Sequence, residues 1–149
     1  MKVRQAASLR AVQYSERHAN EGDQPLKTQE QAIGFTAGMM FSNGYVAGNT
    51  LYVAGQQGPD SNGNVTGTDI TLQTTNAIAA VKQVAEEAGF KMTDIVSVTV
   101  YVTDLHDVPK MNEVYRKLIP DPKPARVALQ VTGLIGGAKI EIAAIAVKH

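Results

Sequence analysis

Two stretches carry most of the information about the fold: Pro124–Val131, PARVALQV, and, after a glycine-containing loop, Lys139–Val147, KIEIAAIAV. Both are apolar and rich in β-formers, so they are predicted to be strands of a largely buried sheet. Each run nevertheless carries a charge near its beginning: Arg126 starts the first run and Glu141 lies early in the second. A charge in such a strand is costly unless it is paired or used. The two residues are therefore a structural ion pair, charges at strand ends, or members of a functional site.

The composition describes a neutral chain without cysteine. Its 149 residues favour a single domain, and a chain of this size buries ~70% of its unfolded surface. The 14 basic residues balance the 14 acidic ones and are scattered, which argues against nucleic acid or an anionic membrane as a partner. The absence of cysteine excludes disulfides and thiolate sites. No apolar run reaches membrane-spanning length and the N-terminus lacks a signal-peptide core, so a cytoplasmic protein is predicted.

Residues 1–27 differ from the rest of the chain. They are rich in Gln, Arg, Glu, His and Asn, and their apolar pattern is too short to predict a helix. This segment is predicted to be an arm, either loosely ordered or packed on a partner subunit. Residues 28–149 are predicted to form the folded domain.

Apolar and alternating runs predict five strands. The runs 45–47 and 50–55 flank the turn pair Gly48-Asn49, which is typical of a β-hairpin. Residues 96–102 alternate valine with polar side chains, as in a strand with one buried face. The last two strands are the runs quoted above, and Gly136-Gly137 between them is predicted to be the turn of a second hairpin.

Two segments have helical periodicity. Apolar residues recur at steps of three and four over 70–88, where Thr68 or Asp69 is expected to cap the start and Gly89 to follow the end. Residues 108–118 predict a second helix. The resulting order, ββαβαββ, indicates an α+β fold with a mixed sheet and two helices on one face. The other face, left without helices and partly apolar, predicts oligomerisation.

Motifs for the common catalytic sites are absent. His18, His106 and His149 are not spaced as metal ligands, so no metal site is predicted. The chain has no Gly-x-Ser-x-Gly, no Gly-x-Gly-x-x-Gly opening a helix, and no phosphate-binding loop. Arg126 and Glu141 therefore remain the main candidates for chemistry.

Several separated motifs, taken in order, resemble the RidA family, also called YjgF or L-PSP. They are AGNTLYVAGQ (47–56), EEAG (86–89), DIVSVTVYV (94–102), MNEVY (111–115), PAR (124–126) and IEI (140–142). The resemblance runs from about Met39 to His149. It implies a chorismate-mutase-like fold and a homotrimer whose sheets form a central β-barrel, with active sites between subunits. It also implies hydrolysis of reactive enamines and imines of small carboxylates to 2-keto acids and ammonia, without metal or cofactor.

The resemblance also suggests roles for individual residues. Arg126 matches the arginine that holds the substrate carboxylate, a role that suits a planar guanidinium. Glu141 matches the glutamate that positions and activates the attacking water, as a general base can. Gly55 matches a backbone position that lines the pocket, and Asn112 matches a helix asparagine expected in a structural role.

The pocket departs from the best-known members of that family. Where they carry Ser, Cys and Tyr, this chain has Ala54, Ala128 and Phe41. Fewer side chains can then hydrogen-bond to the substrate, which predicts a changed substrate preference. The open alternatives are a general imine deaminase, a deaminase of a larger amino-enoate such as 2-aminomuconate, and a trimer that binds small carboxylates without catalysis. A ribonuclease is disfavoured by the neutral charge and the lack of an aromatic cluster.

Overall fold

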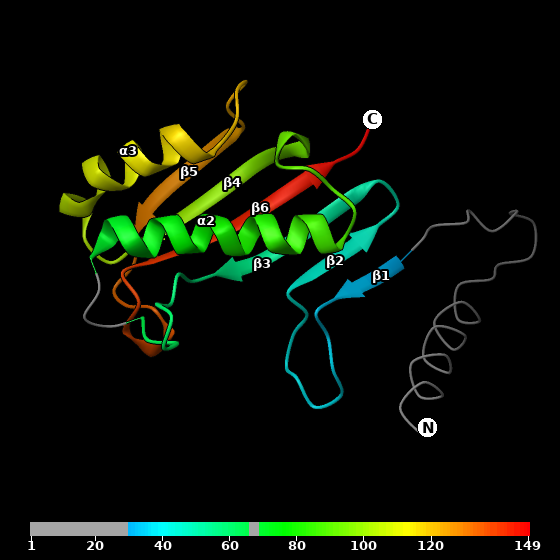
Figure 1. Cartoon of the computed structure of the whole chain (residues 1–149), viewed down its shortest axis with the longest axis horizontal. Helices are drawn as coiled ribbons and strands as arrows, with labels where there is room; N and C mark the ends of the chain where they lie inside the picture. The colour runs from blue at the N-terminus through cyan, green and yellow to red at the C-terminus, as the bar shows by residue number, and fades with distance from the viewer. Residues whose placement is uncertain (1–29, 66–68) are drawn as a thin grey trace, which may run out of the picture.

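The computed structural model describes residues 30–65 and 69–149, so the predicted arm, residues 1–27, lies outside the described part of the chain. The described strands form one mixed sheet of six, in the order β1-β2-β3-β6-β4-β5. They are β1 (Glu30–Ile33), β2 (Gly44–Ala47), β3 (Thr50–Gln56), β4 (Ile95–Val102), β5 (Ala125–Gln130) and β6 (Ile140–Val147). Helices α2 (Ile70–Glu87) and α3 (Val108–Leu118) lie against one face (Figure 1). The predicted α+β architecture is confirmed.

The ends of α2 follow from local chemistry. Asp69 is the N-cap, and its carboxylate accepts a hydrogen bond from the backbone N–H of Leu72 at 2.8 Å. At the other end Gly89 has a φ of +76°, a conformation that glycine adopts without a side-chain clash. Its N–H and that of the next residue donate back to carbonyls of the last turn. The predicted roles of Asp69 and Gly89 are confirmed.

The last two strands do not form the predicted hairpin. β5 lies at the sheet edge and pairs in parallel with β4, whereas β6 lies between β3 and β4 and is antiparallel to both. The parallel pair arises because α3 crosses over between β4 and β5. Gly136 and Gly137, both at a φ of +76°, belong to a short 3-10 turn, Ile135–Gly137, in the connection from the edge strand to the central one. The hairpin interpretation is therefore wrong, because a turn signal does not reveal which strand is the neighbour.

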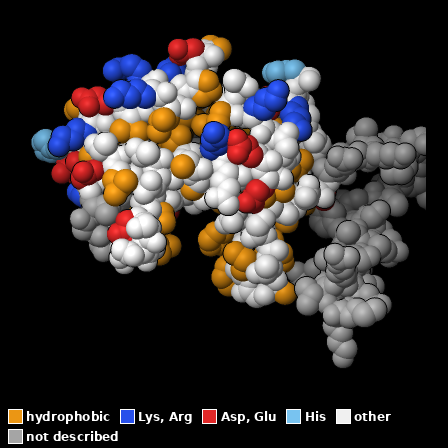
Figure 2. Space-filling model, viewed as in Figure 1, with side chains coloured by type: hydrophobic (Ala, Val, Ile, Leu, Met, Phe, Trp, Pro, Cys, Tyr) orange, Lys and Arg blue, Asp and Glu red, His pale blue; other side chains and the backbone are white. Residues whose placement is uncertain are grey.

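The sequence does not predict β1, which pairs antiparallel with β2 at the other edge of the sheet. Only Ile33 of its four residues is buried, so the strand lacks the apolar pattern that would identify it. The loop from β1 to β2, residues 34–43, extends away from the sheet (Figure 1). Hydrophobic side chains gather on it (Figure 2). These exposed side chains are Phe35, Met39, Met40 and Phe41.

The core lies between the helices and the sheet. Alternate residues of the central strands, such as Val100 and Ile142, pair on the helix-covered face and are buried. On the opposite face, large side chains stay exposed: Tyr45, Tyr52, Val127 and Leu129. Such an uncovered apolar face suits contact with another chain, and the oligomer stays a prediction. Within residues 30–65 and 69–149, no helix has the length and hydrophobicity needed to cross a membrane.

Candidate functional site

The predicted site residues separate into two groups on different parts of the sheet. The Arg126 group comprises Arg126 and Ala128 on β5 together with Asn112 and Tyr115 on α3. The Glu141 group comprises Glu141 on β6, Ala54 and Gly55 on β3, and Gln57 just after β3. Phe41 belongs to the loop 34–43 before β2. Tyr115 and Gln57 are additions that the sequence interpretation did not single out.

Arg126 is braced by side chains of α3. Its Nη1 donates a hydrogen bond to Oδ1 of Asn112 at 2.7 Å, and its guanidinium lies 4.7 Å from the centre of the Tyr115 ring. The same nitrogen approaches the sulfur of Met111 at 4.0 Å. These contacts restrain the guanidinium while it stays solvent-exposed on an edge strand. An arginine held in this way presents its remaining N–H groups to an anion, and a carboxylate can accept two of them in parallel.

The buried ring of Tyr115 supports the guanidinium of this arginine. The residue is 6% exposed, and its hydroxyl oxygen is buried without a hydrogen-bond partner within the described part of the chain. Burial raises the pKa of the Tyr115 hydroxyl, and the positive charge of Arg126 acts in the opposite direction. The ring therefore remains neutral at ordinary pH and interacts with Arg126 through its π face.

Glu141 lies against the backbone of Gly55. A Cβ on residue 55 would sit 2.5 Å from Oε2 of Glu141 and 2.7 Å from its carboxyl carbon, so no side chain fits there while the glutamate keeps this position. On the other side, Nε2 of Gln57 donates to Oε1 of Glu141 at 3.2 Å. The carboxylate is half-buried between these neighbours. This arrangement can hold a carboxylate in one orientation toward a water molecule.

Ala54 lies on β3 next to Gly55, and Phe41 belongs to the loop before β2. The strand register shifts between Val53 and Gln56, and Ala54 and Gly55 lie within this irregular stretch. The backbone N–H of Ala54 donates to the carbonyl of Asn43 at 2.9 Å, which ties the end of the loop 34–43 to β3. Phe41, 62% exposed, lies two residues before that anchor. Its ring is therefore exposed at the surface.

Arg126 and Glu141 lie on opposite faces of the sheet. Arg126 is in register with Val98, which is buried under the helices, and Ala128 shares that face. Glu141 is in register with Tyr101, which belongs to the opposite face. Side chains of one strand alternate between faces, and β4 separates the two strands. The two charges therefore do not form an ion pair within one chain, and one chain alone does not hold them in one pocket.

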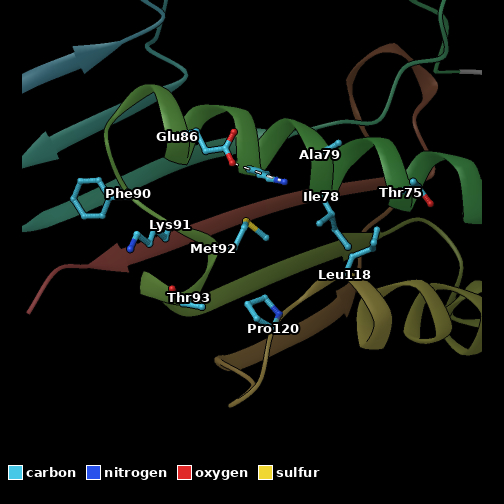
Figure 3. Close-up of a pocket in the computed structure, with 11 residues that line it drawn as sticks. Thr75, Ile78, Ala79, Glu86, Phe90, Lys91, Met92, Thr93, Leu118 and Pro120 are labelled. Atoms are coloured by element: carbon cyan, nitrogen blue, oxygen red, sulfur yellow. Dashed lines mark ion pairs between the residues drawn. The ribbon is translucent and has the colours of Figure 1, made fainter.

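A groove among the described residues lies away from both groups. It has a volume of about 610 Å³ and runs between α2, the end of α3 and the segment 90–93 (Figure 3). Ile78, Met92 and Leu118 contribute apolar surface, and Lys82 and Glu86, 3.8 Å apart, form an ion pair at its margin. Within the part of the chain that the structure describes, no cluster of His, Cys, Asp or Glu could hold a metal ion.

Gln57 and Tyr115 were missed for different reasons. Gln57 follows the strand that ends at Gln56, where a polar residue is ordinary, and its contact with Glu141 spans 84 positions of sequence. Tyr115 lies on the apolar stripe of α3 and is explained there as a core residue. The spacing of three from Asn112 places both on the same side of the helix, which is the signal that could have linked them to Arg126.

Comparisons with known proteins agree with the motifs. The family model described as Endoribonuclease L-PSP matches residues 31–148. A RutC family protein of Pyrococcus abyssi is 44% identical over 110 residues, which cover 73% of this chain and 87% of that protein. The human 2-iminobutanoate/2-iminopropanoate deaminase is 31% identical over 109 residues, covering 72% and 80%. The crystal structure of RidA from an Antarctic Psychrobacter matches with a TM-score of 0.72 and 32% identity, covering 79% of this chain and 99% of that one.

Proposed function

Because the chain belongs to the RidA/YjgF family, also described as endoribonuclease L-PSP, we propose that it is a deaminase that hydrolyses 2-imino and 2-enamino acids to 2-keto acids and ammonia. The observation that carries this proposal is the bracing of Arg126 by Asn112 and Tyr115, which holds an exposed guanidinium in place without neutralising its charge. A structural arginine would be expected to pair with a carboxylate, whereas Arg126 forms no ion pair among the residues that the structure describes, so its guanidinium suits an external anion. The deaminase name of the human relative supports the same substrate class.

The proposed reaction uses the two charged residues in separate roles. Arg126 binds the carboxylate of the substrate with two parallel hydrogen bonds. Glu141 accepts a proton from water as the water oxygen bonds to the imine carbon, and the same proton is then delivered to the imine nitrogen, which gives an adduct with one hydroxyl and one amino group. The hydroxyl proton passes to that nitrogen, the C–N bond breaks and ammonia leaves as the carbonyl of the 2-keto acid forms, so Glu141 ends as a carboxylate again. No redox step is involved, so the atoms balance with water as the only co-reactant.

This mechanism requires more than one copy of the chain. Arg126 and Glu141 lie on opposite faces of one sheet, so a second copy must bring its own Arg126 group beside the Glu141 group of the first. The uncovered face with Tyr52, Val127 and Leu129 is available to form the contact. We propose a homotrimer whose sheets meet at a central barrel. Light scattering of the intact chain should return the mass of three copies, and a stable monomer would contradict both the assembly and the shared site.

The replaced pocket residues define the preferred substrate. Ala54, Ala128 and Phe41 offer no side-chain hydroxyl or thiol, so the pocket favours larger or more apolar imino acids, with an amino-enoate such as 2-aminomuconate as one candidate. Each lost hydrogen bond is worth about 0.5–1.5 kcal/mol net. A panel of enzymatically generated imines of increasing size, scored by keto-acid formation, tests this preference. The combined change Ala54→Ser, Ala128→Cys and Phe41→Tyr should shift the preference toward the three- and four-carbon imines.

Two results of the panel would contradict the proposal in different ways. If wild type already processes the smallest imines fastest and the triple variant leaves the ranking unchanged, the preference argument is wrong while the deaminase stands. If no imine accelerates ammonia release although a small carboxylate binds, the chain is a carboxylate-binding protein. That second function is favoured by the apolar replacements in the pocket, and measuring ammonia separates it from catalysis.

A further inference from the structure

We propose that Gln57 is a positioning residue for Glu141, an inference that rests on the proposed function. Gln57 does not reach the substrate in this proposal. It acts by holding the Glu141 carboxylate in the orientation from which that group directs water. The inference goes beyond the roles suggested by the family motifs, because the motif AGNTLYVAGQ (47–56) ends at Gln56 and Gln57 lies outside it.

The direction of the Gln57 amide is determined by its two neighbours. Nε2 lies 2.8 Å from the carbonyl oxygen of Ile135 and 3.2 Å from Oε1 of Glu141. Both of these atoms are acceptors, so only the NH₂ end of the amide can face them, and its two hydrogens serve both. The side chain therefore connects the Glu141 carboxylate to the turn Ile135–Gly137.

Gly55 and Gln57 restrain the carboxylate from two directions. The Gly55 backbone approaches the carboxyl carbon so closely that a Cβ would be 2.7 Å away, and the Gln57 amide holds Oε1. A carboxylate accepts up to about four hydrogen bonds, so the amide leaves acceptor capacity for a water molecule. Without Gln57 only the packing against Gly55 would remain, and the end of the glutamate would gain rotational freedom.

Anchoring of the local loop does not by itself account for Gln57. The segment after β3 is already attached to α2, because Nδ2 of Asn76 donates to the carbonyl of Pro59 at 2.8 Å. Gly58 also packs against the backbone carbonyl of Gln73, where no Cβ could fit. These two contacts hold the loop independently of Glu141. The specific contribution of Gln57 is its contact with the carboxylate.

The test compares Gln57→Leu with a matched control in the intact chain of 149 residues. Leucine keeps the approximate size of glutamine and removes both N–H groups. We expect kcat for imine hydrolysis to fall roughly 10- to 100-fold, since a small misplacement of a reacting group can cost this much, while KM changes by less than about twofold. The control Asn76→Leu removes an amide that anchors the same loop without touching Glu141. It should retain the kcat of wild type.

A double-mutant cycle distinguishes positioning from general damage. If Gln57 acts through Glu141, adding Gln57→Leu to Glu141→Gln should cause little further loss, because the carboxylate that it positions is already gone. The proposal is overturned if the two effects multiply, if Gln57→Leu keeps the kcat of wild type, or if Asn76→Leu lowers kcat equally.

A structural measurement keeps the proposal separate from the deaminase assignment. If wild type hydrolyses no imine, the proposed function fails, and crystal structures of wild type and Gln57→Leu then decide about positioning. The inference expects the Glu141 carboxylate to leave its place against Gly55 in the variant. A carboxylate that stays in the same place overturns the inference whatever the activity.

Discussion

The Arg126 group and the Glu141 group carry opposite charges and restrain them through different contacts. Arg126 is exposed on an edge strand and rests on an aromatic ring, with one hydrogen bond to Asn112. Glu141 is half-buried on a central strand, against a glycine backbone and under an amide donor. The first group is suited to capture an anion that arrives from solvent. The second is suited to keep a carboxylate in one orientation.

This difference indicates how binding and chemistry are divided. A group that binds a charged substrate has to be accessible and strongly attractive. A group that directs water has to be oriented within a fraction of an ångström. Substitutions in the Arg126 group should therefore mainly raise KM, and substitutions in the Glu141 group should mainly lower kcat.

The largest expected effect is that of Glu141→Gln. Glutamine preserves the shape of the side chain but cannot accept the proton of the attacking water. General-base catalysis of this kind contributes roughly 10²–10⁴-fold, so kcat should fall by about that factor while KM stays close to wild type. Steady-state kinetics with a generated imine measures both constants. Normal turnover would show that Glu141 is structural and that the division of roles is wrong.

Arg126→Ala should cost about as much in kcat/KM but through substrate binding. A hydrogen bond to a charged group is worth about 1.5–3 kcal/mol and a bidentate pair more, so hydrolysis at low substrate concentration should be almost abolished. Arg126→Lys should recover little, because lysine lacks the planar fork. The melting temperature serves as the control, since an exposed edge residue contributes little to the core. Activity near that of wild type with unchanged melting would reject the anchor role.

Gly55→Ala tests the Glu141 group while the glutamate itself is kept. The new methyl group would lie 2.5 Å from Oε2, so the glutamate has to move. We expect kcat to fall about 10-fold or more from this displacement. Folding should be preserved, because Gly55 is exposed and has an ordinary backbone conformation. Circular dichroism and light scattering confirm the fold, and an unchanged kcat would show that the orientation of Glu141 is not critical.

The smallest effects on the kinetic constants are expected at Tyr115, whose ring packs against the guanidinium of Arg126. Tyr115→Leu removes a cation–π contact worth about 0.5–1 kcal/mol, so KM should rise only a few-fold. Tyr115→Phe keeps the ring and removes a hydroxyl that is buried without a partner among the described residues. Its KM should match wild type and its melting temperature should stay equal or rise, since burying an unpaired hydroxyl is unfavourable. If the Tyr115→Phe variant has a higher KM than wild type, the hydroxyl rather than the ring contributes to substrate binding.

Local features of the fold were predictable because their causes are local. α3 has the predicted bounds 108–118, and the cap at Asp69 and the glycine at 89 occur where the sequence indicates. The position of β6 between β3 and β4 was not predictable from its own residues, since any apolar strand would suit a central place. The same limit applies to the site. Motif resemblance points to Arg126 and Glu141, whereas their placement on opposite faces depends on strand order and register.

Gln57 shows this limit most clearly. Its identity carries no signal, because a glutamine after a strand is compatible with many surroundings. Its partners Ile135 and Glu141 lie 78 and 84 positions away, and only the folded chain brings the three together. Contacts between residues so far apart in the sequence leave no periodic pattern from which they could be predicted.

Strand β5 has a consequence for the behaviour of the chain at high dilution. It is the last strand of the sheet, all six of its residues are exposed, and on its outer side the described chain provides no neighbouring strand. A lone copy would therefore offer free N–H and C=O groups together with the apolar Val127 and Leu129, a combination that invites uncontrolled strand pairing. If that surface is covered by other copies, dilution should lower the melting temperature and promote aggregation, so that the concentration of the protein becomes part of its stability.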